Sequence, residues 1–136
     1  MSLAAYSKPK SAVLLCIDDN EEVLECEKAF LETFGYTVLT AASGARGLEL
    51  ACVHPVDVVI VDYFMPEMDG QEFSLEMRQL RPQAPIIMLS AAANVPMQAL
   101  KLVDAFIPKF DLADALLPAI AQLHDRGRSE LFSYDG

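Results

Sequence analysis

Residues 56–70 have the sequence VDVVIVDYFMPEMDG, which contains the clearest structural signal in this chain. The run Val56–Val61 is apolar except for Asp57 and is rich in β-branched residues, which predicts a strand. Its continuous apolar character is typical of a parallel strand that is covered on both faces. Asp62 ends the strand, and the Pro, Asp and Gly of the segment Met65–Gly70 predict a turn before the next helix.

Short apolar runs of the same kind alternate with segments of helical periodicity along the chain. The predicted strands are Val13–Ile17, Tyr36–Thr40, Val56–Val61, Ile86–Leu89 and Ala105–Pro108. The predicted helices span residues 20–34, 44–51, 71–80, 97–103 and 112–123. Repeated βα units of this kind predict an α/β fold around a central parallel sheet.

The first predicted helix carries one apolar stripe at the spacing i, i+3, i+7, i+11. The stripe consists of Val23, Cys26, Phe30 and Phe34. We expect it to face the core, with the glutamates between its members facing solvent. Gly35 is expected to end this helix in a left-handed conformation.

The length of 136 residues is typical of one domain. With 53% hydrophobic residues the chain can form a core, which excludes wholesale disorder. We expect a folded domain over residues 12–124, preceded by an N-terminal tail at 1–11. Residues 125–136 lack hydrophobic periodicity and are interpreted as a C-terminal tail or the start of a linker.

Charge restricts the partners that this chain can bind. Ten Lys and Arg residues stand against 20 Asp and Glu, and the net charge is −10. Such a surface repels phosphate backbones and anionic lipids, so we expect no direct nucleic-acid or membrane binding.

The sequence has no signal-peptide pattern and no apolar stretch of about 18 residues, which favours the cytoplasm. The three cysteines lack a CxxC spacing and are expected to be reduced.

Polar residues follow four of the five predicted strands. Asp18 and Asp19 come after the first strand, Asp62 after the third, Ser90 after the fourth and Lys109 after the fifth. In an open parallel sheet, ligands bind outside the carboxyl ends of the strands. The sequence therefore predicts that three carboxylates, a hydroxyl and an ammonium group converge on one basin.

Three carboxylates in one basin require a cation. Two of them about 4 Å apart repel each other by about 4 kcal/mol at an effective dielectric constant near 20. Oxygen ligands without nearby His or Cys favour Mg²⁺ or Mn²⁺ over zinc, and Mg²⁺ commonly binds a phosphate oxygen as well. Asp62 can then act as a nucleophile, while Ser90 and Lys109 neutralise the oxygens of an incoming phosphoryl group.

The Asp18–Asp19 pair, the string DYFMPEMDG at 62–70, Ser90–Ala91 and Lys109 together closely resemble the receiver domain of two-component response regulators. The resemblance covers about Ser11–His124. It implies a flavodoxin-like (βα)5 fold, a three-layer sandwich with a five-stranded parallel sheet in the order 2-1-3-4-5. It also implies a phosphorylation switch that does not turn over a substrate as an enzyme does.

The resemblance assigns roles to the acidic residues. Asp62 matches the phospho-acceptor, which receives its phosphoryl group from a sensor histidine kinase or a histidine phosphotransfer protein. Mg²⁺ is the implied cofactor: Asp19 and Asp62 match direct ligands, and Asp18 matches the residue that holds a metal-bound water. The backbone carbonyl of Phe64 matches a further ligand.

The resemblance assigns three more residues to the switch. Ser90 matches the hydroxyl that moves toward the phosphoryl group, Lys109 the cationic clamp, and Phe106 the aromatic residue that turns inward. The downstream protein effector is not identified by the sequence.

Phe110 stands where the family usually has a proline after a cis bond, so we expect a trans peptide. Because the Ser90–Lys109 segment is short for the family, we expect an atypical output face.

Two positions that often hold polar side chains in the family, for orienting a hydrolytic water, are Phe64 and Ala92 here. This substitution predicts a long-lived phosphoryl group. The alternative function is a Mg²⁺-dependent phosphohydrolase with an aspartyl nucleophile, but such enzymes commonly carry a second Asp two residues later, where this chain has Phe64. A flavin-binding module is disfavoured because Asp18 and Asp19 would repel the flavin phosphate.

Overall fold

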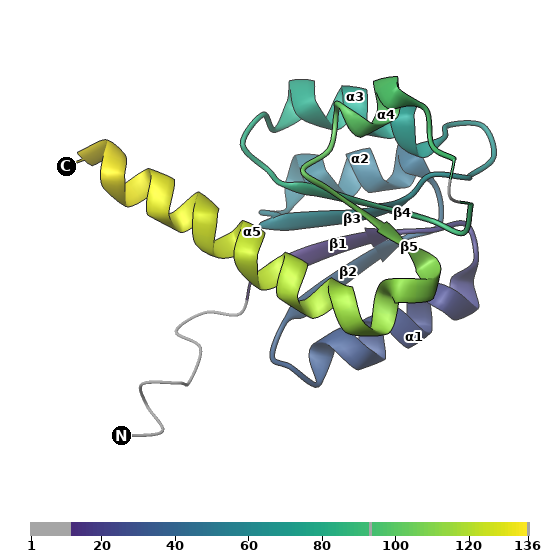
Figure 1. Cartoon of the computed structure of the whole chain (residues 1–136), viewed down its shortest axis with the longest axis horizontal. Coiled ribbons are helices and arrows are strands. Elements are labelled where there is room, and N and C mark those ends of the chain that lie inside the picture. The colour runs from purple at the N-terminus through teal and green to yellow at the C-terminus, as the bar shows by residue number, and fades with distance from the viewer. Residues whose placement is uncertain (1–11, 93, 136) are drawn as a thin grey trace.

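The computed structural model describes residues 12–92 and 94–135, so the predicted N-terminal tail lies outside the described residues. Strands and helices alternate along the chain as the sequence predicts (Figure 1). The strands are β1 (Val13–Ile17), β2 (Thr37–Ala41), β3 (Val58–Asp62), β4 (Ile86–Ser90) and β5 (Ala105–Pro108). The helices are α1 (Glu21–Glu32), α2 (Gly44–Val53), α3 (Gly70–Leu80), α4 (Met97–Leu100) and α5 (Leu112–Asp135), and a 3₁₀ helix, η2 (Lys109–Asp111), precedes α5.

The five strands form one parallel sheet in the order β2-β1-β3-β4-β5. Helices α1 and α5 cover one face of the sheet, and α2, α3 and α4 cover the other (Figure 1). The prediction of a three-layer flavodoxin-like fold with this strand order is confirmed. The order makes β1 and β3 neighbours, so their carboxyl ends lie side by side.

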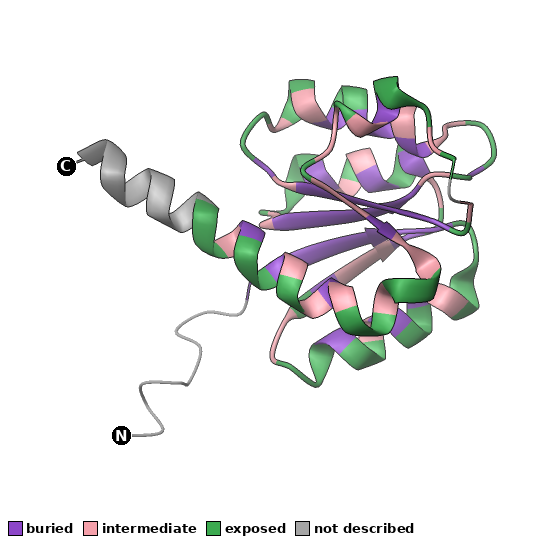
Figure 2. Ribbon diagram, viewed as in Figure 1, coloured by how far each residue is buried: buried purple, intermediate pink, exposed green. Residues whose placement is uncertain are grey.

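The sheet separates two apolar clusters (Figure 2). In β1, Leu14 and Cys16 face α1 and α5, while Leu15 and Ile17 face α2 and α3. This alternation follows from the period of two along a strand. Since both faces of β1, β3 and β4 are buried, their continuous apolar sequences are explained by the parallel architecture.

The prediction for the buried face of α1 is wrong. Its buried residues are Leu24, Glu27 and Leu31. Phe30 and Phe34 are 41% and 49% exposed, and their rings pack edge to face with centroids 5.3 Å apart. The helix therefore has two sets of residues with helical spacing. The buried set contains Glu27 between two leucines, so a search for apolar periodicity selects the exposed set instead.

The predicted end of the last helix is also wrong. Helix α5 continues to Asp135, so residues 125–135 are helical although their sequence has no hydrophobic periodicity. The segment after Leu123 contains no proline and several good helix formers, so a helix can propagate there without an apolar stripe. The extension projects beyond the sheet (Figure 1). Within the described residues, no helix is both long and apolar enough to cross a bilayer.

Gly70 allows the start of α3 to lie against the end of β3. A Cβ atom at this position would lie 2.8 Å from the carbonyl oxygen of Asp62 and 2.8 Å from the Cα of Tyr63. Both atoms belong to the backbone and cannot move without displacing the strand end. Gly44 differs, because a Cβ there would meet the flexible end of the Met68 side chain, with the sulfur at 2.7 Å.

We therefore expect Gly70→Ala to lower the free energy of unfolding by about 1–3 kcal/mol, the usual cost of overpacking. Gly44→Ala is the matched control and should cost clearly less, since Met68 can change rotamer. Urea denaturation followed by circular dichroism measures both. Equal losses for the two variants would show that the contact between α3 and the end of β3 is not tight.

Candidate functional site

Asp18 is held at the end of β1 by the turn into α1. Its backbone N–H donates to the carbonyl oxygen of Ala41 on β2 (3.2 Å), and its carboxylate Oδ1 accepts from the N–H of Asn20 (2.9 Å). The Asn20 side chain in turn caps α1, accepting from the backbone N–H groups of Glu22 and Val23. The strand end, the turn and the helix start thus fix the direction of the buried Asp18 carboxylate.

Asp62 is the last residue of β3 and is only 6% exposed. The next residue, Tyr63, donates its N–H to the carbonyl of Leu89 on β4 (2.8 Å), and its own carbonyl accepts from Gly70 (2.8 Å). At the start of α3, Asp69 and Glu72 form a reciprocal capping box. The loop after Asp62 is therefore tied to the neighbouring strand and to the following helix.

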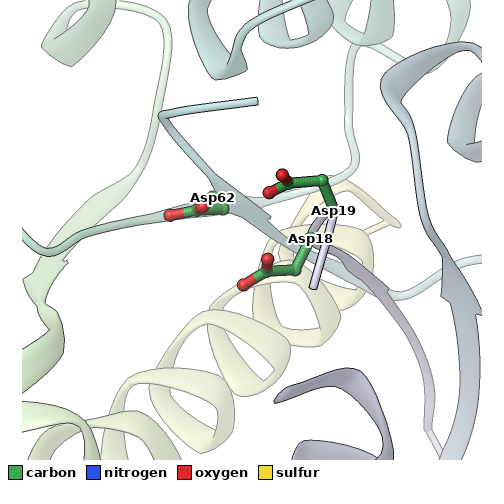
Figure 3. A group of neighbouring side chains, drawn as sticks. All are labelled: Asp18, Asp19 and Asp62. Carbon is green, nitrogen blue, oxygen red and sulfur yellow. The ribbon is translucent and has the colours of Figure 1, made fainter. Parts of the chain in front are cut away.

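The structure brings the three predicted aspartates together. Each of Asp18, Asp19 and Asp62 offers a carboxylate oxygen, and these oxygens all lie within 4.8 Å of one another. Figure 3 shows the three carboxylates, from the ends of β1 and β3, pointing into the same space. Asp18 and Asp62 are buried, whereas Asp19 is exposed and opens the cluster to solvent.

Lys109, in η2, joins this cluster. Its Nζ lies 3.2 Å from Asp18 Oδ2 and 3.3 Å from Asp62 Oδ1, so one ammonium group bridges the ends of two strands. The predicted grouping of Asp18, Asp19, Asp62 and Lys109 is therefore present in the structure. The Lys109–Phe110 peptide is trans, as expected, since the described residues contain no cis bond.

The electrostatics of the cluster favour an additional cation. Burial raises the pKa of Asp62 to about 6; Lys109 opposes this shift and Asp18 adds to it. Burial tends to lower the pKa of Lys109, but Asp62 and Asp18 outweigh it and raise that pKa above its usual value. Because one ammonium group contacts two of the three carboxylates, negative charge remains uncompensated. The donor atoms are all carboxylate oxygens, and they fit a hard divalent cation such as Mg²⁺.

The other three predicted site residues, Ser90, Phe64 and Phe106, are not part of the aspartate cluster. Ser90 ends β4, is buried, and its Oγ accepts the N–H of Ala92 (3.1 Å). Phe64 is 54% exposed and packs edge to face on Tyr63. Phe106 is partly buried in β5 and is paired in register with Met88 of β4. Among the described residues, no side-chain hydrogen bond or ion pair joins these three to the cluster.

Glu27 is an ionisable residue next to the site that the sequence analysis missed. The residue is only 7% exposed, and its Oε2 has no hydrogen-bond partner. Burial, then the charge of Asp18, raises its pKa to about 7. Glu27 lies three residues after Leu24 and four before Leu31, so this spacing could have placed it on the same buried face of α1 as the two leucines.

The fold and the cluster define a flavodoxin-like α/β domain with an acidic site at the carboxyl edge of its sheet. Residues 14–117 match the family model described as response regulator receiver domain. The chain belongs to this family and is a receiver domain of two-component response regulators.

Individual relatives agree with this assignment. Transcriptional regulatory protein GlrR of Escherichia coli is 40% identical over 87 residues, which are 64% of this chain but 20% of GlrR. Response regulator MprA of Mycobacterium ulcerans is 30% identical over 123 residues, 88% of this chain and 53% of MprA. The chain thus spans about half or less of these curated relatives.

Solved structures agree as well. A CheY-like receiver domain protein from Methanospirillum hungatei has a TM-score of 0.84 at 28% identity, covering 89% of this chain and 99% of that one. Response regulator TrrA from Thermotoga maritima, solved in complex with Mg²⁺ and BeF, has a TM-score of 0.76 at 29% identity, covering 82% and 98%.

The raised pKa values predict how stability depends on pH. The pKa values of Asp62 and Glu27 are about 6 and about 7 in the fold, above those of unfolded carboxyl groups. The folded protein therefore binds more protons than the unfolded chain between about pH 4 and pH 7. Without divalent cations, the free energy of unfolding should fall as the pH rises through this range.

Urea denaturation in the presence of a chelator, at about pH 5 and about pH 8, measures this fall. Asp62→Asn and Glu27→Gln should each reduce it, and the exposed-site control Glu76→Gln should leave it unchanged. The interpretation is wrong if both buried-site variants retain the full wild-type decrease.

Proposed function

We propose that this receiver domain is a Mg²⁺-dependent phosphorylation switch that accepts a phosphoryl group on Asp62. The observation that carries the proposal is the convergence of three carboxylates within 4.8 Å, with Lys109 bridging two of them. Such a cluster is unfavourable unless a cation occupies it, and Mg²⁺ pairs naturally with a phosphoryl ligand. Membership of the receiver family supports the same conclusion.

The proposed metal site uses the residues that follow β1 and those at and just after the end of β3. Asp19, Asp62 and the backbone carbonyl of Phe64 would hold the cation directly, and Asp18 would hold it through a water. When bound, Mg²⁺ would neutralise the carboxylates and the oxygens of the incoming phosphoryl group. The exposure of Asp19 leaves the site open toward a partner.

In the proposed transfer, a carboxylate oxygen of Asp62 attacks the phosphorus of a phosphohistidine. An O–P bond forms while the N–P bond breaks, and the leaving imidazole takes up a proton. Lys109 stabilises the charge on the phosphoryl oxygens, since its ammonium group already lies 3.3 Å from Asp62 Oδ1. The raised pKa of about 6 still leaves the Asp62 carboxyl mainly ionised at neutral pH.

The proposed switch involves the end of β4 and the middle of β5. The Ser90 hydroxyl would give up its hydrogen bond with Ala92 and donate instead to a phosphoryl oxygen. Phe106, partly buried on the neighbouring strand, would turn inward into the space that this movement opens. The surface over α4 and β5 would then change with the phosphorylation state.

The proposed donor is a sensor histidine kinase or a histidine phosphotransfer protein in the cytoplasm. Residues 12–124 would form the receiver domain, and the helical extension at 125–135 would act as a linker. The net charge of −10 supports a protein effector, with no direct nucleic-acid or membrane contact by this domain. The relatives are signalling regulators, which supports a switch over a turnover enzyme.

Incubation with acetyl phosphate and Mg²⁺, followed by intact-mass measurement, tests the acceptor directly. The wild-type protein should gain the mass of one phosphoryl group, and Asp62→Asn should gain none because a neutral amide replaces the nucleophilic carboxylate. Asp114→Asn, an exposed site on α5, is the control and should react like the wild type. Phosphorylation of Asp62→Asn to the wild-type extent would contradict the proposal.

The phosphoryl group should be long-lived, because neither Phe64 nor Ala92 has a polar side chain that could orient an attacking water. Replacement by Phe64→Asn or Ala92→Glu should accelerate its loss roughly tenfold by positioning that water. Leu75→Asn replaces an exposed apolar residue elsewhere and controls for polarity alone. Timed intact-mass spectra measure the decay; rapid loss in the wild type that neither variant accelerates would refute this explanation.

A further inference from the structure

Glu27 occupies a position where the fold alone favours an apolar residue. It lies between Leu24 and Leu31 on the buried face of α1, and those leucines pack in the apolar cluster between the sheet and helices α1 and α5. The Glu27 side chain is nine-tenths buried, yet its Oε2 has no hydrogen-bond partner. A buried carboxyl without full hydrogen bonding destabilises a protein, so packing does not explain this residue.

Glu27 lies beneath the acidic site. Cys16 of β1 lies in the same buried cluster as Leu24 and Leu31, the two leucines that flank Glu27 on the buried face of α1. Asp18 follows on the same face of the strand, about 7 Å further along it, because side chains alternate with a period of two residues. Glu27 is therefore about one layer of side chains below Asp18.

The charged groups around Glu27 come from several elements. Asp18 follows β1, Asp62 ends β3 and Lys109 lies in η2, and all three influence the Glu27 carboxyl electrostatically. On α1 itself, the Lys28 ammonium group is directed to Glu32 and to the carbonyl of Val38. Lys109 contacts Asp18 and Asp62, and its charge also lowers the pKa of Glu27.

We propose that Glu27 is a positioning residue of the metal site, whose buried carboxylate strengthens divalent-cation binding without contacting the cation. The proposal rests on the proposed function and deepens it. One ammonium group would then balance four carboxylates instead of three, which increases the attraction for a divalent cation. This attraction is weakly screened, because the charge lies under the protein surface where ions and water do not reach it.

The ionisation of Glu27 sets the conditions of the test. Burial and the nearby charge of Asp18 raise its pKa to about 7, and a bound cation would favour the ionised form. At about pH 8 the carboxyl is mostly charged, and Glu27→Gln then removes the charge while retaining the size of the side chain.

Isothermal titration with MgCl₂ at about pH 8 measures the effect on the intact chain. Glu27→Gln should bind Mg²⁺ at least about tenfold more weakly than the wild type, since a buried charge beyond contact distance is weakly screened from a divalent cation. Glu25→Gln removes a charge from an exposed position on the same helix and should differ from the wild type by less than about twofold.

Denaturation in a chelator separates this role from a structural one. Glu27→Leu completes the apolar stripe of α1, so it should raise the urea midpoint of the cation-free protein while weakening Mg²⁺ binding as much as Glu27→Gln does. A purely structural residue would not show greater stability together with weaker cation binding. If Glu27→Gln does not fold, the affinity of Glu27→Leu decides.

The outcomes separate this inference from the proposed function. Wild-type Mg²⁺ affinity in the folded Glu27 variants, together with lost binding in Asp19→Asn, would overturn the role of Glu27 and leave the metal site intact. No Mg²⁺ binding by the wild-type protein would instead overturn the proposed function.

Discussion

The carboxylates of Asp18, Asp19 and Asp62 lie together at the carboxyl edge of the sheet and repel one another. Their carboxylate oxygens lie within 4.8 Å of one another, and two like charges about 4 Å apart repel by about 4 kcal/mol at an effective dielectric constant near 20. Lys109 offsets part of this repulsion through its contacts at 3.2 and 3.3 Å with two of the carboxylates. The repulsion that Lys109 does not offset must be balanced by the packing of the fold or by a bound cation. The cluster therefore attracts positive charge.

The fold resists the repulsion by attaching the carboxylates to rigid elements. Strands β1 and β3 are neighbours in one sheet, and their residues are buried on both faces. The helix cap at Asn20 and the close contact at Gly70 fix the two chain segments that leave these strands. Because the site is built on the ends of central strands, its geometry follows from the packing of the sheet. Binding surfaces can vary around it in the loops and in the short α4.

The strands and the grouping of the three aspartates could be predicted from the sequence, because the apolar runs of four of the five parallel strands end at a polar residue of the site. The buried face of α1 could not, since Glu27 interrupts the stripe and Phe30 and Phe34 form a more hydrophobic one on the exposed side. The end of α5 was missed because helix propagation there does not depend on an apolar period. The relation of Ser90 to the cluster depends on side-chain direction, which residue spacing does not determine.

A crystal structure of the protein with Mg²⁺ and beryllium fluoride, which mimics a phosphoryl group, tests whether Asp62 is the acceptor at a metal site. We predict electron density for the fluoride adduct on a carboxylate oxygen of Asp62, with a cation between it and Asp19, and the Lys109 ammonium group against a fluorine atom. An adduct on any other residue, or a cation bound away from the three aspartates while Asp62 stays unmodified, would contradict the account.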